Sequence, residues 1–190
     1  MSADLAWAAV EWPGMEHVVV AGDTTGFRAD GHVVMADEGL ASVTYHLQCT
    51  SGWRVACLDI EVTSAASSAS SQLASAGDGR WLVDGVPAPE LDGCVDVDIN
   101  CTPLTNTLPI RRLSWSRGAV HDIDVVYVPV PSLAFHRARQ RYTLLARDEA
   151  GDGDLFRYES GSFRADLQVD GDGFVVDYPG LWRRVERASA

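Results

Sequence analysis

Short runs of β-branched and aromatic residues, separated by turn-forming residues, dominate the chain. Several runs alternate apolar and polar positions, which places one face of an extended strand on a core and the other on water or a cavity. The runs that we expect to be strands are 17–21, 32–36, 41–49, 53–62, 123–130, 163–169 and 174–178. Many short strands at this spacing are typical of an antiparallel barrel or sandwich.

Asp-Gly steps punctuate these runs and supply the positive φ angles that tight hairpins need. We expect turns at 29–31, 77–79, 151–153 and 170–173. Over 135–147, helical spacing competes with β-like alternation, and we predict a strand. The Ala/Ser-rich segment 65–76 indicates either a flexible loop or a poor edge strand.

The chain of 190 residues is long enough to bury a full core, and no linker divides it. We therefore predict one all-β domain over 1–190, a many-stranded antiparallel β-barrel or barrel-like roll. The steps Trp53-Arg54 and Phe163-Arg164 each begin a similar apolar alternation. This echo indicates either an internal duplication or two strands that obey the same alternation.

Composition and charge narrow the classes of partner. Apolar residues make up 46% and charged residues 22%, as in a folded globular protein, and the net charge is −12. All 15 basic residues are Arg. Because nucleic acids and anionic membrane surfaces attract basic patches, we expect neither as a partner.

From the sequence we expect no targeting signal, no membrane span and no metal site. Its first residues lack a basic region and include Asp4 and Glu11, so we expect no signal peptide and a cytoplasmic protein. No apolar run is long enough to cross a bilayer, so stable membrane insertion is not expected. The cysteines, expected to be reduced, are Cys49, Cys57, Cys94 and Cys101. None forms a C-x-x-C pair, and we predict no metal and no cofactor.

The most unusual stretch is 93–113, GCVDVDINCTPLTNTLPIRRL. If its first part is extended, Asp96, Asp98 and Asn100 share one face. Two Pro steps then bracket a turn, and the chain returns through Arg111 and Arg112. The pattern predicts a hairpin that sets the carboxylates opposite the guanidinium groups. It is either an ion-paired structural hairpin or a polar site for a hydroxyl-rich ligand.

Three motifs together resemble the bacterial family described as "putative glycolipid-binding". They are DVDINCTPLTNTLPIRRL at 96–113, QRY at 140–142 and DYPGLWRR at 177–184. The resemblance implies a single-domain antiparallel barrel with a lipid or glycolipid-like ligand. The family's shape is likened to periplasmic carriers of lipoproteins, a role that a chain without an export signal is not expected to share.

We expect binding without catalysis, in or at the mouth of the barrel. The candidate ligand-binding residues are Asp96, Asp98, Asn106, Arg111, Arg112, Trp53, Trp81, Tyr142 and Tyr178. For each aromatic residue, the alternative is ordinary core packing. The 178–180 segment predicts a turn that leaves Trp182 packed and both Arg183 and Arg184 outside.

Two other functions compete with binding. A hydrolase or isomerase would use Asp96 and Asp98 as an acid–base pair on a small polar or sugar substrate. We expect the neighbouring Arg residues to lower the pKa of both carboxyls, which argues against this alternative. A protein-interaction module would pair through an exposed sheet edge or apolar patch and would have a closed, dry interior.

Overall fold

The computed structural model describes residues 1–36, 39–75, 79–147 and 153–188. The first half of the chain forms the strands β1 Ser2–Ala9, β2 Gly14–Gly22, β3 Gly26–Met35, β4 Ala41–Thr50, β5 Val55–Ser64, β6 Ser68–Ser75, β7 Trp81–Val83 and β8 Val86–Pro87. The second half forms β9 Asp96–Ile99, β10 Val120–Val128, β11 His136–Arg147, β12 Asp154–Ser160, β13 Phe163–Val169, β14 Val175–Tyr178 and β15 Trp182–Ala188. The helical elements are the 3₁₀ turns η1 Pro89–Leu91 and η2 Leu104–Asn106, and the helix α1 Thr107–Arg112.

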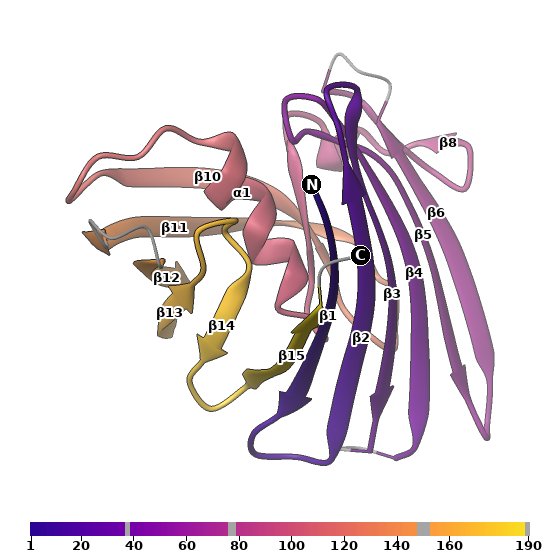
Figure 1. Cartoon of the computed structure of the whole chain (residues 1–190). Helices are drawn as coiled ribbons and strands as arrows, with labels where there is room; N and C mark the ends of the chain where they lie inside the picture. The colour runs from indigo at the N-terminus through magenta and orange to yellow at the C-terminus, as the bar shows by residue number, and fades with distance from the viewer. Residues whose placement is uncertain (37–38, 76–78, 148–152, 189–190) are drawn as a thin grey trace.

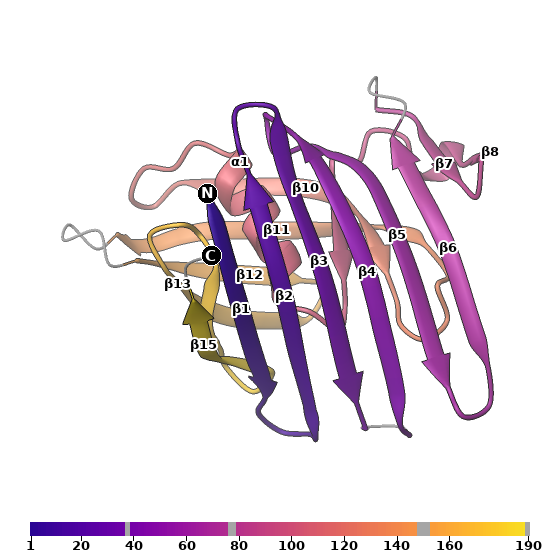
Figure 2. The ribbon, with the colours of Figure 1, turned by 45° about the vertical axis from the view of Figure 1, so that its right-hand side comes forward.

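All strands belong to one sheet, whose order is β8-β7-β6-β5-β4-β3-β2-β1-β15-β14-β13-β12-β11-β10-β9. Every pairing is antiparallel except that of β9 with β10. The sheet curls so that its second half crosses the first, with α1 between them (Figures 1 and 2). Beside β9, the backbone N–H of Val55 donates to the carbonyl of Val95 at 3.3 Å, but the ladder does not close. The all-β, barrel-like prediction is confirmed.

Alternation along the strands builds the core. In β2, Glu16, Val18 and Val20 are buried, whereas His17 and Val19 are exposed. The largest fully buried side chains are Trp7, Trp81, Tyr45, Tyr142, Phe156 and Phe174. These rings fill the space inside the roll.

Each of the seven predicted runs overlaps a strand, and segment 135–147 is a strand, as predicted. The Ala/Ser-rich segment contains β6, whose pairing with β7 covers only Leu73–Ser75. The remainder of β6 therefore borders the sheet as the predicted edge strand would. Residue 76 lies outside the described residues. The internal duplication suggested by Trp53-Arg54 and Phe163-Arg164 stays a prediction.

The turn prediction at 29–31 is wrong, because Asp30 and Gly31 lie inside β3. A Cβ atom at Gly31 would come within 2.0 Å of the Tyr45 ring on β4. The glycine thus provides room for an aromatic ring rather than a turn. The turn at 170–173 is confirmed by a hydrogen bond from Gly173 N–H to Asp170 O at 2.8 Å. The other two predicted turns, at 77–79 and 151–153, include residues 77–78 and 151–152, which lie outside the described residues.

The 178–180 segment turns as predicted, with Leu181 N–H donating to Tyr178 O at 2.9 Å, and Trp182 is buried. Arg183 is exposed, but placing Arg184 outside was wrong. The Arg184 side chain is only 15% exposed and pairs with Asp170 at 2.5 Å. No helix among the described residues is long and apolar enough to cross a membrane.

Candidate functional site

The predicted hairpin at 93–113 is wrong after β9. Instead of a turn and a return strand, η2 and α1 follow, and residues 101–110 are all buried. We call residues 102–112 the plug, because this helical segment lies between the two halves of the sheet (Figure 1). Pro103 and Pro109 stand at the first turns of η2 and α1, where a backbone N–H has no helical partner to lose. The two prolines that indicated a bracketed turn therefore lie at the N-cap of η2 and in the first turn of α1.

The pairing of Asp96 with Arg112 is confirmed, although it runs from strand to helix. Arg112 donates from Nε at 3.1 Å and from Nη2 at 2.5 Å to the two carboxylate oxygens. The Asp96 side chain is 1% exposed and the Arg112 side chain is 15% exposed. Such a bidentate pair ties the end of the plug to β9, and the burial of Asp96 leaves its carboxylate out of a ligand's reach.

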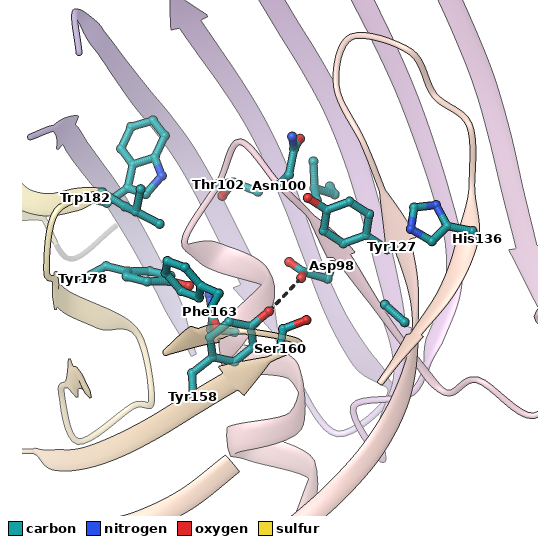
Figure 3. Close-up of a pocket in the computed structure, with 14 residues that line it drawn as sticks. Asp98, Asn100, Thr102, Tyr127, His136, Tyr158, Ser160, Phe163, Tyr178 and Trp182 are labelled. Atoms are coloured by element: carbon teal, nitrogen blue, oxygen red, sulfur yellow. Dashed lines mark hydrogen bonds between the residues drawn. The ribbon is translucent and has the colours of Figure 1, made fainter. Parts of the chain in front are cut away.

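Asp98, the next inward position on β9, borders an open pocket of about 390 Å³. Around it Tyr127 and His136 lie on one side, and Tyr158, Phe163 and Tyr178 on the other (Figure 3). We call this cavity the Asp98 pocket. Its lining is Asp98, Ile99, Asn100, Thr102, Asn106, Tyr127, His136, Ala138, Tyr158, Ser160, Phe163, Tyr178, Leu181 and Trp182.

The Asp98 carboxylate is fixed mainly through one oxygen. Oδ2 accepts hydrogen bonds from Gln140 Nε2 at 2.6 Å and from Tyr158 OH at 3.3 Å, the second of which Figure 3 shows. Oδ1 accepts a bond at 3.4 Å from Thr105. No ion pair involves Asp98 within the described part of the chain. Oδ1 is thus the oxygen with capacity for a ligand donor.

Burial raises the pKa of Asp98, and the hydrogen bonds from Gln140, Tyr158 and Thr105 oppose that rise. Burial also raises the pKa of Asp96 against the opposing effect of Arg112. The expectation that Arg neighbours lower the pKa of both carboxyls was therefore wrong. Removal from water outweighs the charge of Arg112 at one carboxyl, and no Arg contributes at the other.

A second layer supports the pocket wall. Tyr142 is buried and donates its hydroxyl to Asn106 Oδ1 at 2.9 Å, and Asn106 donates to the carbonyl of Pro103 at 3.3 Å. The rings of Tyr142 and Tyr158 lie 5.2 Å apart. These contacts hold the plug against β11 and β12, so that the Asp98 pocket is lined by fixed side chains.

A buried carboxyl on β2 lies behind the same wall. Glu16 accepts hydrogen bonds from Tyr45 OH at 2.6 Å and from Thr102 Oγ1 at 2.7 Å. Burial raises the pKa of Glu16 to about 7. Thr102 also accepts the N–H of Leu104 at 2.9 Å and lines the Asp98 pocket. Glu16 therefore anchors the beginning of the plug.

The structure brings only part of the predicted site together. Asp98, Asn106 and Tyr178 line the Asp98 pocket, and Tyr142 lies directly behind Asn106. Trp81 is a core residue whose Nε1 donates to the carbonyl of Cys94 at 3.1 Å.

Trp53 and Arg111 meet elsewhere. Arg111 lies over the Trp53 ring at 5.1 Å, and Trp53 stacks on Phe27 at 4.5 Å. Arg112 forms the ion pair with Asp96 that is described above. Neither Trp53 nor the two Arg residues line the Asp98 pocket.

Sequence reasoning missed Tyr127, His136, Gln140 and Tyr158. The QRY motif at 140–142 contained a usable signal, since Gln140 shares the inward face of β11 with Tyr142. Tyr127 and Tyr158 occur in ordinary strand patterns. The parallel pairing of β10 with β9 sets Tyr127 beside Asp98, and the curl of the sheet brings Tyr158 of β12 to the same carboxylate.

Among the described residues, no group of three or more His, Cys, Asp or Glu side chains is placed to hold a metal ion. The four cysteines are unpaired thiols, and three of them are buried. Burial raises the pKa of the Cys49 thiol to about 12. These groups are therefore poor ligands and poor nucleophiles at neutral pH.

A family model described as "Putative glycolipid-binding" matches residues 4–184. The chain belongs to that family. A solved structure of a DUF1089 family protein from Pseudomonas aeruginosa is 32% identical, with a TM-score of 0.77, and the match covers 90% of this chain and 92% of the other. No curated protein matches the chain.

A β-barrel-like protein of the DUF1849 group from Brucella abortus has a TM-score of 0.58 at 8% identity, covering 100% of this chain and 96% of that one. This second likeness concerns the fold alone.

Proposed function

We propose that this family member binds the hydroxyl-rich head group of a glycolipid-like ligand in the Asp98 pocket without changing it chemically. The observation that carries the proposal is the Asp98 carboxylate. Its Oδ2 is held by Gln140 and Tyr158, whereas Oδ1 has one long bond from Thr105. A carboxylate fixed in this way accepts hydrogen bonds from the hydroxyl groups of a ligand without first having to be ordered.

The aromatic lining supports the same kind of ligand. Tyr127, Tyr158 and Tyr178 combine apolar faces with hydroxyl groups in one pocket of about 390 Å³. Rings of this kind cover the apolar faces of a sugar while polar groups bind its hydroxyls. Asn100 and Asn106 also line the pocket. Each amide group is bonded within the protein through one N–H and one lone pair, which leaves one of each for a ligand.

The hydrolase alternative lacks its second group. A glycosidase normally places two carboxylates on either side of the scissile bond. Asp98 is the only carboxylate among the residues that line the pocket. Asp96 does not line the pocket and is paired with Arg112. The interaction-module alternative predicts a closed, dry interior, and side chains do fill the inside of the roll. The open pocket beside β9, at the rim, supports binding instead.

The test is titration calorimetry of the purified protein against a panel of neutral methyl glycosides, with the variant Asp98→Asn. Because a hydrogen bond to a carboxylate is worth about 1.5–3 kcal/mol, we expect Asp98→Asn to weaken binding by about tenfold or more. The matched control is Asp124→Asn on β10, whose carboxylate pairs with Arg139 at 3.7 Å and does not line the pocket. Equal affinities for the wild type and Asp98→Asn would refute the proposal.

Mass spectrometry of organic extracts from natively purified protein identifies the head group directly. We expect a glycolipid enriched in the wild-type extract and depleted in the Asp98→Asn extract. A protein of similar net charge, purified in parallel, controls for lipid that adheres without a specific site.

A further inference from the structure

A second hollow, the apolar groove, lies beside the Asp98 pocket and has a volume of about 540 Å³. One side consists of the ends of β3 to β6 and the connections between them, including Met35, Leu40 and Val62. The other side is the connection between β10 and β11, at Val130 and Pro131. The groove therefore lies where the two halves of the curled sheet face each other.

The groove carries no charge, although the chain has a net charge of −12. None of its lining residues is Asp, Glu, Lys or Arg. Leu40 is 70% exposed at its border, which is a high value for a large apolar side chain. An uncharged, apolar wall on an acidic protein favours an apolar occupant over a charged segment of a partner protein.

The Ala/Ser-rich segment finds a role here. Ala65, Ala66 and Ala69 line the groove, and larger side chains at these positions would fill it. Ala69 lies directly opposite the buried Val62, so it belongs to the inward face of β6. The small side chains that made this segment a weak strand pattern keep the groove open.

One residue joins the two hollows. Asn100 lines both the Asp98 pocket and the apolar groove. Its Oδ1 accepts the N–H of Val130 at 2.9 Å, and its Nδ2 donates to the carbonyl of Val130 at 3.4 Å. Asn100 and Val130 thus form a fixed ridge, with polar groups and aromatic rings on one side and aliphatic side chains on the other.

We propose that a single amphiphilic molecule occupies both hollows, with its head group in the Asp98 pocket and its alkyl or acyl chain across the Asn100 ridge in the apolar groove. This inference rests on the proposed function, which supplies the head group. Because Asn100 lines both hollows, we assign the groove to the apolar chain of the molecule whose head group lies in the Asp98 pocket, and not to a separate ligand.

The variant Ala69→Trp blocks the groove at an exposed position, and Ser70→Trp is its matched control. Ser70 is the neighbouring residue, and it lies opposite the exposed Glu61 on the outer face of the sheet. The melting temperatures of both variants show whether each still folds. If Ala69→Trp does not fold, Ala66→Leu replaces it.

The first arm examines the groove alone, through displacement of the neutral fluorescent probe N-phenyl-1-naphthylamine by dodecanol. We expect displaceable binding in the wild type, Ser70→Trp and Asp98→Asn, and its loss in Ala69→Trp. Retention of displaceable binding in Ala69→Trp, or its absence in the wild type, overturns the assignment of the groove. This experiment does not depend on head-group binding in the Asp98 pocket. A failure of the proposed function can therefore be distinguished from a failure of the groove assignment.

The second arm compares methyl and octyl glycosides of the same sugars. A fully buried methylene strengthens binding by about fourfold, so burial of only two methylenes already exceeds about tenfold. We therefore expect the octyl compound to bind at least about tenfold more tightly. Ala69→Trp should remove this gain and leave the methyl glycoside affinity unchanged, whereas Asp98→Asn should weaken both compounds. No gain from the octyl chain, or the same gain in Ala69→Trp, overturns the single-ligand proposal.

Discussion

Replacing Glu16 by Gln tests the physical account of the carboxyl that anchors the plug. Burial raises the pKa of Glu16 from an ordinary 4.5 to about 7. The unfolded chain, in which the side chain is hydrated, keeps the ordinary value. Between the two pKa values the folded protein binds a proton that the unfolded chain does not. The free energy of unfolding therefore falls as the pH rises through this range.

The size of the effect follows from the shift. Since one pKa unit corresponds to about 1.36 kcal/mol, the rise to about 7 removes about 3 kcal/mol of stability above that pH, relative to pH values below 4.5. Between about pH 5 and about pH 8, the loss is about 2–3 kcal/mol. Gln has the shape of Glu but does not titrate. The stability of Glu16→Gln relative to the wild type should therefore increase by that amount over the same interval.

Urea denaturation at several pH values measures this difference. Because every other titrating group is common to both proteins, its contribution cancels in the comparison. Glu61→Gln, at an exposed position on β5, is the control and should run parallel to the wild type. If the difference between Glu16→Gln and the wild type does not change with pH, the buried carboxyl does not titrate in this range and the reasoning is refuted.

Two further predictions concern the frame of the site. Arg112→Met leaves the buried Asp96 carboxylate without its partner and should cost about 3–5 kcal/mol of unfolding free energy in urea denaturation. Arg141→Met, which breaks an exposed ion pair, should cost less than about 1 kcal/mol, and equal losses would contradict the assigned burial. Gly31→Ala puts a methyl group within 2.0 Å of the Tyr45 ring and should lower stability by about 1–3 kcal/mol, with a change in the near-ultraviolet circular dichroism of tyrosine. An unchanged spectrum and stability would show that the ring is not packed there.

The strands could be predicted from the sequence because apolar and polar residues alternate along a strand that is buried on one face. In β2 the alternation also placed Glu16 on the same face as Val18 and Val20. A carboxyl on that face could have been identified as buried, had the buried face been known. Local residue patterns do not give that face, because it depends on the direction in which the whole sheet curls.

The plug could not be predicted in the same way. Residues 101–110 are buried on all sides, so no apolar stripe marks their helical period. Their Thr, Asn and Pro residues are equally typical of a turn and of short helical turns that begin at a proline. Likewise, the Asp98 pocket gathers residues from β9 to β15, and the pairing and curl of these strands, not their local residue patterns, bring the residues together.

The packing of the interior decides where a ligand with an apolar chain can lie. The plug and the buried rings of Trp7, Tyr45 and Phe156 occupy the space inside the roll. A chain cannot enter there without displacing side chains that are less than 2% exposed. It must therefore lie at the rim, and the apolar groove is the uncharged hollow that adjoins the Asp98 pocket.

The charge of the site decides which head groups can follow. Asp98 has no cationic partner within the described residues, and the chain as a whole is acidic. A phosphate or sulfate next to this carboxylate would be repelled at low effective dielectric, whereas the hydroxyl groups of an uncharged sugar would donate hydrogen bonds to it. Neutral glycolipids should therefore bind, and their anionic counterparts with the same chain should not. Competition between the two against the same probe measures that preference.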